Sequence, residues 1–229
     1  MTFLQQRLDA LLEKYSVERQ AILKENTVCI DGTDYPLLPE RSERRFSELK
    51  NIANDGTLKN ISVMRTSRIV AKDNNIFDEL YREYDICQFI LGENIKTVTA
   101  MQNKNTINVI AKTESGIVCT FEIAATLNSG ENPKDKHEII AERGTACDVV
   151  VDTQLKQDSI YLFTDKTQKY TDTDFELYGL NESEIAIVRA AFNAAKSNTP
   201  DQLLNIHKKL TSLVNATHKS IENGRREIL

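Results

Sequence analysis

The sequence predicts a mixed fold of helices and strands organised around an antiparallel meander at residues 85–126. Two observations support this prediction. A helical period ends at Gly92, and three strand-like runs separated by short polar turns follow it up to Thr126. Such short connections are typical of antiparallel neighbours. We therefore expect the remaining elements to pack against this sheet.

The composition is that of a globular protein and disfavours several partners. The 229 residues are 40% apolar, which is enough for a hydrophobic core. The net charge is −5 and Lys and Arg are scattered, so we expect no nucleic-acid partner. No run of about 18 apolar residues occurs and the N-terminus is too polar for a signal peptide, so we expect no membrane partner and a cytoplasmic location.

The first 40 residues predict a helix, a strand and a linker. Apolar residues recur every three or four positions over residues 3–24, which indicates an amphipathic helix. Residues 27–30 form a short strand-like run. An Asp-Gly pair and two prolines within residues 31–40 break periodic structure, so a boundary near residue 40 is expected.

The central part of the chain alternates between helical and strand patterns. A helix beginning at Ser42 ends near Gly56, and residues 59–70 alternate as a strand does. A second helix covers residues 76–91. The meander strands follow at residues 96–102, 106–112 and 116–126.

The last part of the chain passes from strands to helices. Residues 127–135 are rich in Asn, Ser, Gly and Pro and predict a loop. Asn181 and Glu184 have the spacing of a helix-capping box, and Pro200 marks a second helix start. Between this loop and the helix that begins after Asn181, we expect strands at residues 137–142, 146–153 and 158–164.

The sequence contains no complete catalytic or metal-binding motif. All eight glycines are isolated, so neither G-x-G-x-x-G nor a Walker loop occurs, and we expect this chain alone to bind no dinucleotide cofactor. His207 and His218 share a helix face but lie roughly 16 Å apart along its axis. His137 stands alone beside the polar loop. We expect no metal site, and we interpret the four cysteines as reduced core thiols.

Asp85 is the charged residue with the clearest functional candidacy. It lies one helical step from Tyr81 and Gln88, at the border of the apolar helix face. One interpretation is a carboxylate that faces a cavity. The other is an ion pair with Arg82, three residues earlier on the same helix.

Several segments together resemble the C-terminal half of the glucose-fructose oxidoreductase, inositol dehydrogenase and MocA family. They are NDGTLKNISVMR, DICQFILGENIKTVTA, INVIAKTESGIVCTFEIAAT, IIAERGTACDVVVDT and the tail HKKLTSLVNATHKSIENGRREIL. The resemblance covers residues 42–229 and implies an α+β domain. Such a domain has a broad, mostly antiparallel β-sheet with helices packed on one face, and the other face commonly makes subunit contacts. Residues 1–41 resemble a remnant of the preceding Rossmann domain.

The family's Rossmann domain provides its NAD(P) site and a Glu-Lys-Pro motif with the catalytic lysine, and neither is recognisable in this sequence. Glu13, Lys14 and Tyr15 are superficially similar to the motif, but the proline is missing and the segment is helical in pattern. We interpret this similarity as coincidence. The resemblance therefore implies NAD(P) only if a Rossmann domain completes the chain.

The family also uses a His-x-x-Asp pair on the helix before the glycine stop. Counting back from Gly92 gives Asp85 at the aspartate position and Arg82 in place of the histidine. Arginine stays protonated and cannot be a general base, although it can hold a hydroxyl, a carboxylate or a phosphate. The resemblance thus implies Asp85, Arg82 and Tyr81 as substrate-binding candidates, and no confident catalytic residue.

Three hypotheses of function remain open. The favoured one is a non-catalytic module that self-associates as a dimer through the sheet face or binds a sugar or polyol. The second is a subunit or fragment of an NAD(P)-dependent sugar or inositol dehydrogenase whose Rossmann domain is supplied elsewhere. The third is a structural partner of a full-length relative.

Overall fold

The computed structural model describes residues 2–148, 160–163, 167–170 and 174–229. The chain divides into two compact units, one made of Met1–Glu43 with Val150–Leu204 and the other of Arg44–Val149 with Asn205–Leu229. The predicted division assigns residues 1–41 and 42–229 to two different domains of the family. The compactness of the two units does not test this assignment, so the division stays a prediction.

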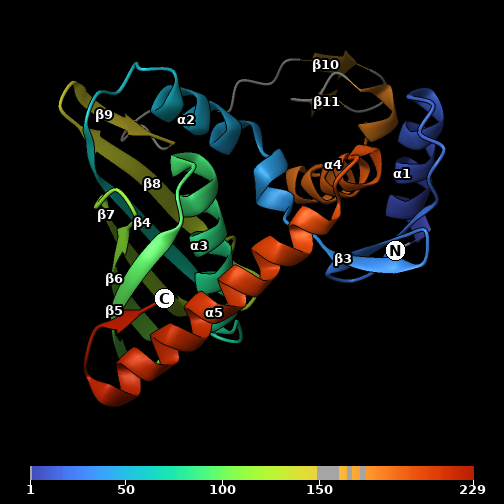
Figure 1. Cartoon of the computed structure of the whole chain (residues 1–229). Helices are drawn as coiled ribbons and strands as arrows, with labels where there is room; N and C mark the ends of the chain where they lie inside the picture. The colour runs from blue at the N-terminus through green and yellow to red at the C-terminus, as the bar shows by residue number, and fades with distance from the viewer. Residues whose placement is uncertain (1, 149–159, 164–166, 171–173) are drawn as a thin grey trace. The chain divides into compact units, whose positions relative to one another are not determined.

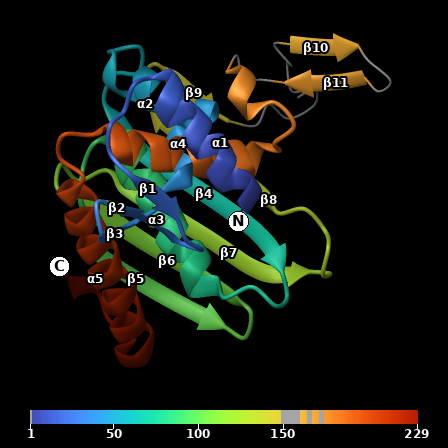
Figure 2. The same ribbon diagram turned by 90° about the vertical axis from the view of Figure 1, so that its right-hand side faces the viewer.

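The second unit contains, within the described residues, a seven-stranded sheet that we call the large sheet. Strands β4 and β7 in its middle are parallel, and the other neighbouring pairs are antiparallel. Figure 2 shows β5, β6, β7, β4 and β8 side by side. In sheet order the strands are β12 (Glu227–Ile228), β5 (Ile95–Asn103), β6 (Thr106–Thr113), β7 (Val118–Leu127), β4 (Ile61–Ala71), β8 (Lys134–Ala141) and β9 (Gly144–Cys147).

Helices cover one face of the large sheet (Figure 1). They are α2 (Arg44–Asn54), α3 (Ile76–Leu91) and α5 (Asp201–Asn223). The strands alternate accordingly: Val109 on β6 is fully buried, whereas its neighbour Ile110 is 54% exposed. The predicted α+β class, with a mostly antiparallel sheet and helices on one face, is confirmed.

Local signals define α3 at both ends. The side chain of Asn75 accepts a hydrogen bond from the backbone N–H of Phe77, and Gly92 ends the helix in the left-handed conformation with φ 70°.

A hydrogen bond joins α3 to α5. The Tyr84 hydroxyl lies 2.6 Å from Oγ1 of Thr217 on α5. Since that Thr217 hydroxyl donates to the carbonyl of Leu213, Tyr84 is the donor to Thr217.

The first unit packs helices against a small antiparallel sheet. Its core includes Leu8, Leu11, Val28 and Val188. Its elements among the described residues are α1 (Thr2–Lys14), β1 (Ala21–Leu23), β2 (Thr27–Ile30), β3 (Thr33–Pro36), η1 (Pro39–Ser42), the pair β10 (Ile160–Phe163) and β11 (Thr167–Tyr170), η2 (Phe175–Leu177) and α4 (Glu182–Lys196).

The first predicted helix is too long. It ends at Lys14 and not near residue 24, because Ser16 takes a left-handed conformation with φ 52° and Ala21–Leu23 pairs with β2 as a strand.

The predictions for the last part of the chain have mixed outcomes. The capping box of Asn181 and Glu184 is confirmed. The strand predicted at residues 146–153 lies mostly outside the described residues, and so do parts of the one at 158–164.

Helices in the described part of the chain lack the combination of length and apolar character that crossing a bilayer requires.

Candidate functional site

A cluster of buried and partly buried charged side chains lies between the large sheet and the helices of the second unit. Strand β8 contributes two of its members because Asp135, His137 and Ile139 alternate onto one face of the strand. We call this group the charged cluster; its members are Arg45, Arg68, Glu79, Arg82, Glu83, Asp135, His137 and Asp148.

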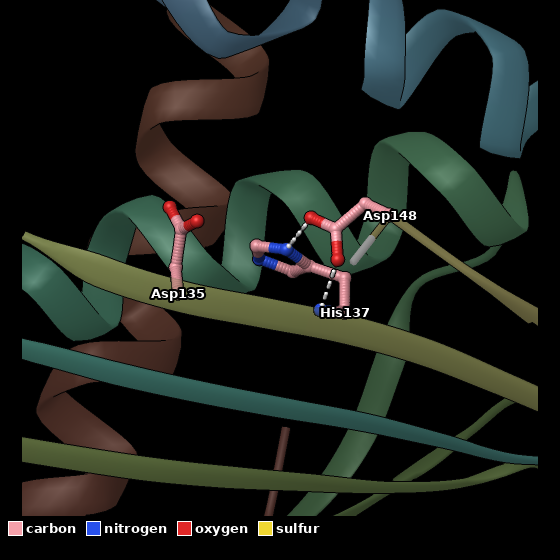
Figure 3. A group of neighbouring side chains, drawn as sticks. All are labelled: Asp135, His137 and Asp148. Carbon is pink, nitrogen blue, oxygen red and sulfur yellow. Dashed lines mark hydrogen bonds and ion pairs between the residues drawn. The ribbon is translucent and has the colours of Figure 1, made fainter. Parts of the chain in front are cut away.

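His137 is the centre of the cluster, and its side chain is completely buried. Its Nε2 lies 2.7 Å from Oε2 of Glu83, and its Nδ1 lies 2.6 Å from Oδ2 of Asp148. The backbone N–H of His137 also donates to Oδ1 of Asp148 at 2.7 Å. Figure 3 shows Asp148 reaching over the imidazole to make both contacts.

The hydrogen-bond partners of the two ring nitrogens indicate the protonation state of His137. Carboxylates only accept hydrogen bonds, so an imidazole held between two of them must carry a proton on each nitrogen. Burial alone lowers the pKa of His137, but the charge of Glu83 and the hydrogen bond to Asp148 outweigh it and raise the pKa to about 9. His137 is therefore a cation at neutral pH.

Arginine side chains converge on Asp135 from three elements. Arg45 on α2 holds both carboxylate oxygens at 2.7 and 3.0 Å, Arg68 on β4 donates at 3.1 Å, and Nη2 of Arg82 on α3 lies 3.5 Å away. Burial alone raises the pKa of Asp135, but Arg45 outweighs it and holds that pKa well below its usual range.

The remaining contacts close the network. Arg68 also pairs with Glu79, Arg82 lies 3.4 Å from Glu83, and Arg45 lies 3.2 Å from Asp148. Among the described side chains of the cluster, three arginines and a protonated His137 balance four carboxylates. This balance allows the groups to be buried, since an uncompensated charge there is costly.

Asp135, His137 and Asp148 have ligand atoms within 4.8 Å of one another, which is the spacing of a metal site. The surroundings do not suit a cation. Both nitrogens of His137 are hydrogen-bonded to carboxylates, and Arg45 already forms ion pairs with both Asp135 and Asp148. The absence of a resident metal stays a prediction.

The three predicted substrate-binding residues lie in different surroundings on α3. Arg82 belongs to the charged cluster, with a side chain that is 15% exposed. The Tyr81 hydroxyl is 2.8 Å from Nδ1 of His207 on α5. Asp85 is only 1% exposed. The structure thus brings Tyr81 to His207 and Arg82 to Asp135, while the pairing of Asp85 with Arg82 stays a prediction.

Lys14 forms ion pairs with two carboxylates of the first unit. Its Nζ lies 2.7 Å from Glu176 and 3.0 Å from Asp174, and the Tyr15 hydroxyl donates to Asp174 at 2.9 Å. The hydrogen bonds to Glu176 and Asp174 raise the pKa of Lys14. An ammonium stabilised in this way is unsuited to accept a proton.

Sequence reasoning missed most of the charged cluster. From the sequence only Arg82 is a candidate, and His137 is expected to be an isolated imidazole, whereas its side chain is completely buried. One local signal exists, because Glu79 and Glu83 lie four residues apart on the buried face of a strongly apolar helix. Their partners Arg68 and His137 lie on strands β4 and β8, and only the packing of α3 on the sheet brings these side chains together.

Comparison with known proteins gives similarity in structure alone. No protein-family model matches the chain, and no curated protein matches it. A myo-inositol dehydrogenase from Corynebacterium glutamicum ATCC 13032 is 16% identical, with a TM-score of 0.59, and the match covers 84% of this chain and 63% of that one.

Two further structures give the same result. Myo-inositol 2-dehydrogenase from Lactobacillus plantarum has a TM-score of 0.59 at 13% identity, over 84% of this chain and 63% of its own. Scyllo-inositol dehydrogenase from Lactobacillus casei, solved with bound NAD(H) and scyllo-inositol, has a TM-score of 0.56 at 13% identity, over 83% of this chain and 63% of its own. The matches span less than two thirds of these proteins, a coverage consistent with a C-terminal domain. These three structural neighbours are inositol dehydrogenases, in agreement with the predicted resemblance to the glucose-fructose oxidoreductase, inositol dehydrogenase and MocA family, and the chain shares the fold of the part that it covers.

Proposed function

We propose that this chain is a self-associating module with the fold of a dehydrogenase substrate domain, and that it does not transfer hydride by itself. The observation that supports the proposal is a group of exposed apolar side chains on the face of the large sheet opposite the helices. Met101 on β5 is 71% exposed, Ile110 on β6 is 54% exposed and Ile228 on β12 is 71% exposed.

The strand register gives these apolar side chains a common direction. Thr99 pairs with Ile110, and Thr97 pairs with Ile228, while Met101 lies two residues beyond Thr99 on the same strand. Residues paired across strands share a face, as do residues two apart. Exposed apolar side chains gathered on one sheet face favour a protein partner.

A second copy of this chain is the partner that we propose for this face. Inositol dehydrogenases share the fold, and the family resemblance implies subunit contact through this face. A two-fold dimer would place the same strands of both copies against each other, so that one patch serves both subunits.

Sedimentation equilibrium of the purified chain tests self-association. We expect a dimer, and we expect Ile110→Asp to weaken dimerisation at least tenfold because a carboxylate would be buried in the contact. Ile22→Asp is the matched control, since Ile22 is 57% exposed in the other unit. A wild-type chain that stays monomeric at high concentration, or equal effects of both variants, would overturn the proposal.

The charged cluster supports the absence of hydride transfer by this chain alone. Arg82 stands at the position where the family resemblance expects a proton acceptor, and it is engaged with Asp135 and Glu83. His137 in the same cluster is protonated and cannot accept a proton at neutral pH. A fluorescence titration with NADH and NADPH tests this part of the proposal, and saturable binding with turnover of an inositol would refute it.

A sugar or polyol is the ligand class that we propose for the surroundings of Tyr81, Arg82 and Asp85. The support is the family resemblance together with the scyllo-inositol bound to the Lactobacillus casei enzyme. Isothermal titration calorimetry with inositols and hexoses measures such binding directly. Heat of binding that disappears in Tyr81→Phe and Arg82→Gln would support this site, and unchanged heat would place the ligand elsewhere.

A further inference from the structure

His137 joins three parts of the second unit. Its Nε2 contacts Glu83 on α3, 54 residues away, and its Nδ1 and backbone N–H contact Asp148, which follows β9. The Phe46 ring on α2 meets the imidazole edge-on, with the ring centroids 4.8 Å apart. Helix α3, strand β8 and the chain after β9 therefore meet at one imidazole.

The two carboxylates differ in the support that other groups give them. Asp148 receives the backbone N–H of His137 at 2.7 Å and the guanidinium of Arg45 at 3.2 Å, in addition to the ring nitrogen. Glu83 is completely buried, and its nearest arginine nitrogens are at 3.4 Å in Arg82 and 3.9 Å in Arg68. The short contact from Nε2 is thus the closest that Glu83 makes to a cationic side chain among the described residues.

We propose that the second proton of His137 acts as a latch, which ties Glu83 on helix α3 and Asp148 after β9 to strand β8 and opens when that proton is lost. A neutral imidazole keeps one N–H. It therefore donates to only one of the two carboxylates and presents a lone pair to the other. That contact becomes repulsive, and the bridge from α3 through His137 to Asp148 is broken.

The charged groups that face His137 in the described part of the chain all enter this equilibrium. Glu83 and Asp148 contact it directly, and Asp135 adds a further negative charge from the same strand. The opposing positive charges come from α2, β4 and α3, in Arg45, Arg68 and Arg82. Glu79 in turn neutralises Arg68. Among these described groups the carboxylates outnumber the arginines by one, which favours the charged imidazole.

The latch makes stability depend on pH in a defined direction. A histidine whose pKa rises on folding contributes fully below its ordinary value of 6.5 and loses the contribution as the pH rises to about 9. We expect the folding equilibrium constant to fall by roughly 100-fold across this range through His137. His137→Gln should abolish that part of the pH dependence. His207→Gln is the matched control, because His207 is exposed on α5.

Nitrogen NMR of the wild-type imidazole tests the proposal without any variant. We expect His137 to carry protons on both ring nitrogens at neutral pH and to titrate near pH 9, and Glu83→Gln should lower the midpoint of that titration. A singly protonated ring at neutral pH, a midpoint near 6.5, or a pH dependence that persists in His137→Gln would overturn it. If His137→Gln does not fold, the wild-type spectrum and Glu83→Gln still decide the outcome.

Discussion

Nη2 of Arg82 lies 3.5 Å from Oδ2 of Asp135, and this contact joins helix α3 to strand β8. The position that the family resemblance assigns to a proton acceptor is thus occupied by a structural cation. The same guanidinium also lies 3.4 Å from Glu83. Changes at residue 82 will therefore affect folding as well as any chemistry.

Arg82→His should not create dehydrogenase activity in this chain. We expect no reduction of NAD+ or NADP+ with inositols, because a histidine at this position does not supply a dinucleotide site. We also expect the free energy of unfolding to fall by about 1 to 2 kcal/mol, since Asp135 and Glu83 lose a neighbouring cation. Urea denaturation measures the loss, and Arg82→Lys, which keeps the charge, should lose less.

A second arm of this experiment adds a Rossmann-domain protein on a separate polypeptide. Turnover restored by the wild-type chain would favour the dehydrogenase-subunit hypothesis over the non-catalytic module. Mixed oligomers without turnover in native mass spectrometry would instead favour a structural partner of a full-length relative.

Asp135→Asn should destabilise the second unit. Arg45, Arg68 and Arg82 would then converge on a neutral amide, and we expect a loss of about 2 to 4 kcal/mol near neutral pH. The pKa of Asp135 is lowered by folding, so its contribution is complete above the ordinary value of 3.8 and declines as the pH falls below it. The difference between wild type and variant in urea denaturation should therefore shrink in acid. A difference that is constant with pH would contradict this assignment.

The hydrogen bond from Tyr84 to Thr217 should stabilise the packing of α3 on α5. Tyr84→Phe should cost about 1 kcal/mol, because Thr217 Oγ1 loses its donor while the rest of the buried ring is kept. Thr217→Val gives the second edge of a double-mutant cycle. A coupling energy close to zero in thermal unfolding would show that the bond contributes nothing.

Gly92→Ala should destabilise the end of α3. Gly92 has φ 70°, and an added Cβ would lie 3.5 Å from Oδ1 of Asn54, so conformation and not crowding sets the cost. We expect a loss of about 1 kcal/mol in chemical denaturation. Gly92→Asn should lose less because asparagine tolerates the left-handed region, and equal losses would point to another cause.

Metal ions should leave the thermal stability of the protein unchanged. Zinc would have to displace the protons of His137 and the contacts of Arg45 to reach Asp135, His137 and Asp148. Differential scanning calorimetry with added zinc, and separately with EDTA, should give the same midpoint. A midpoint that rises with zinc concentration would reveal a bound ion.

The sequence predicts those parts of the fold that depend on neighbours along the chain. The helix predicted at residues 76–91 has those bounds in the structure, because Gly92 stops it locally. The meander strands are also close to prediction, since short turns determine which strands pair. The helix predicted to residue 24 failed because β1 is stabilised by pairing with β2, which the helical period does not reveal.

The charged cluster was beyond prediction for a physical reason. Arg45 and Asp148 meet across 103 residues, and Glu83 and His137 across 54. Each of these side chains on its own resembles an ordinary surface charge. Their burial follows only from the pairing of β4 with β8 and the packing of α3 on the large sheet, and neither is encoded in local periodicity.

Strand β4 lies between β7 and β8, although both are later in the chain. Its first ladder partner on β7 is Val118, which pairs with Val63, and on the other side Met64 pairs with Ile139. During synthesis, the backbone N–H and C=O groups at both edges of β4 therefore stay unpaired until the later strands β5, β6 and β7 have been made. Nascent chains released before β8 emerges would present one open edge of a central, half-buried strand, and they should be the form of this protein most prone to aggregate.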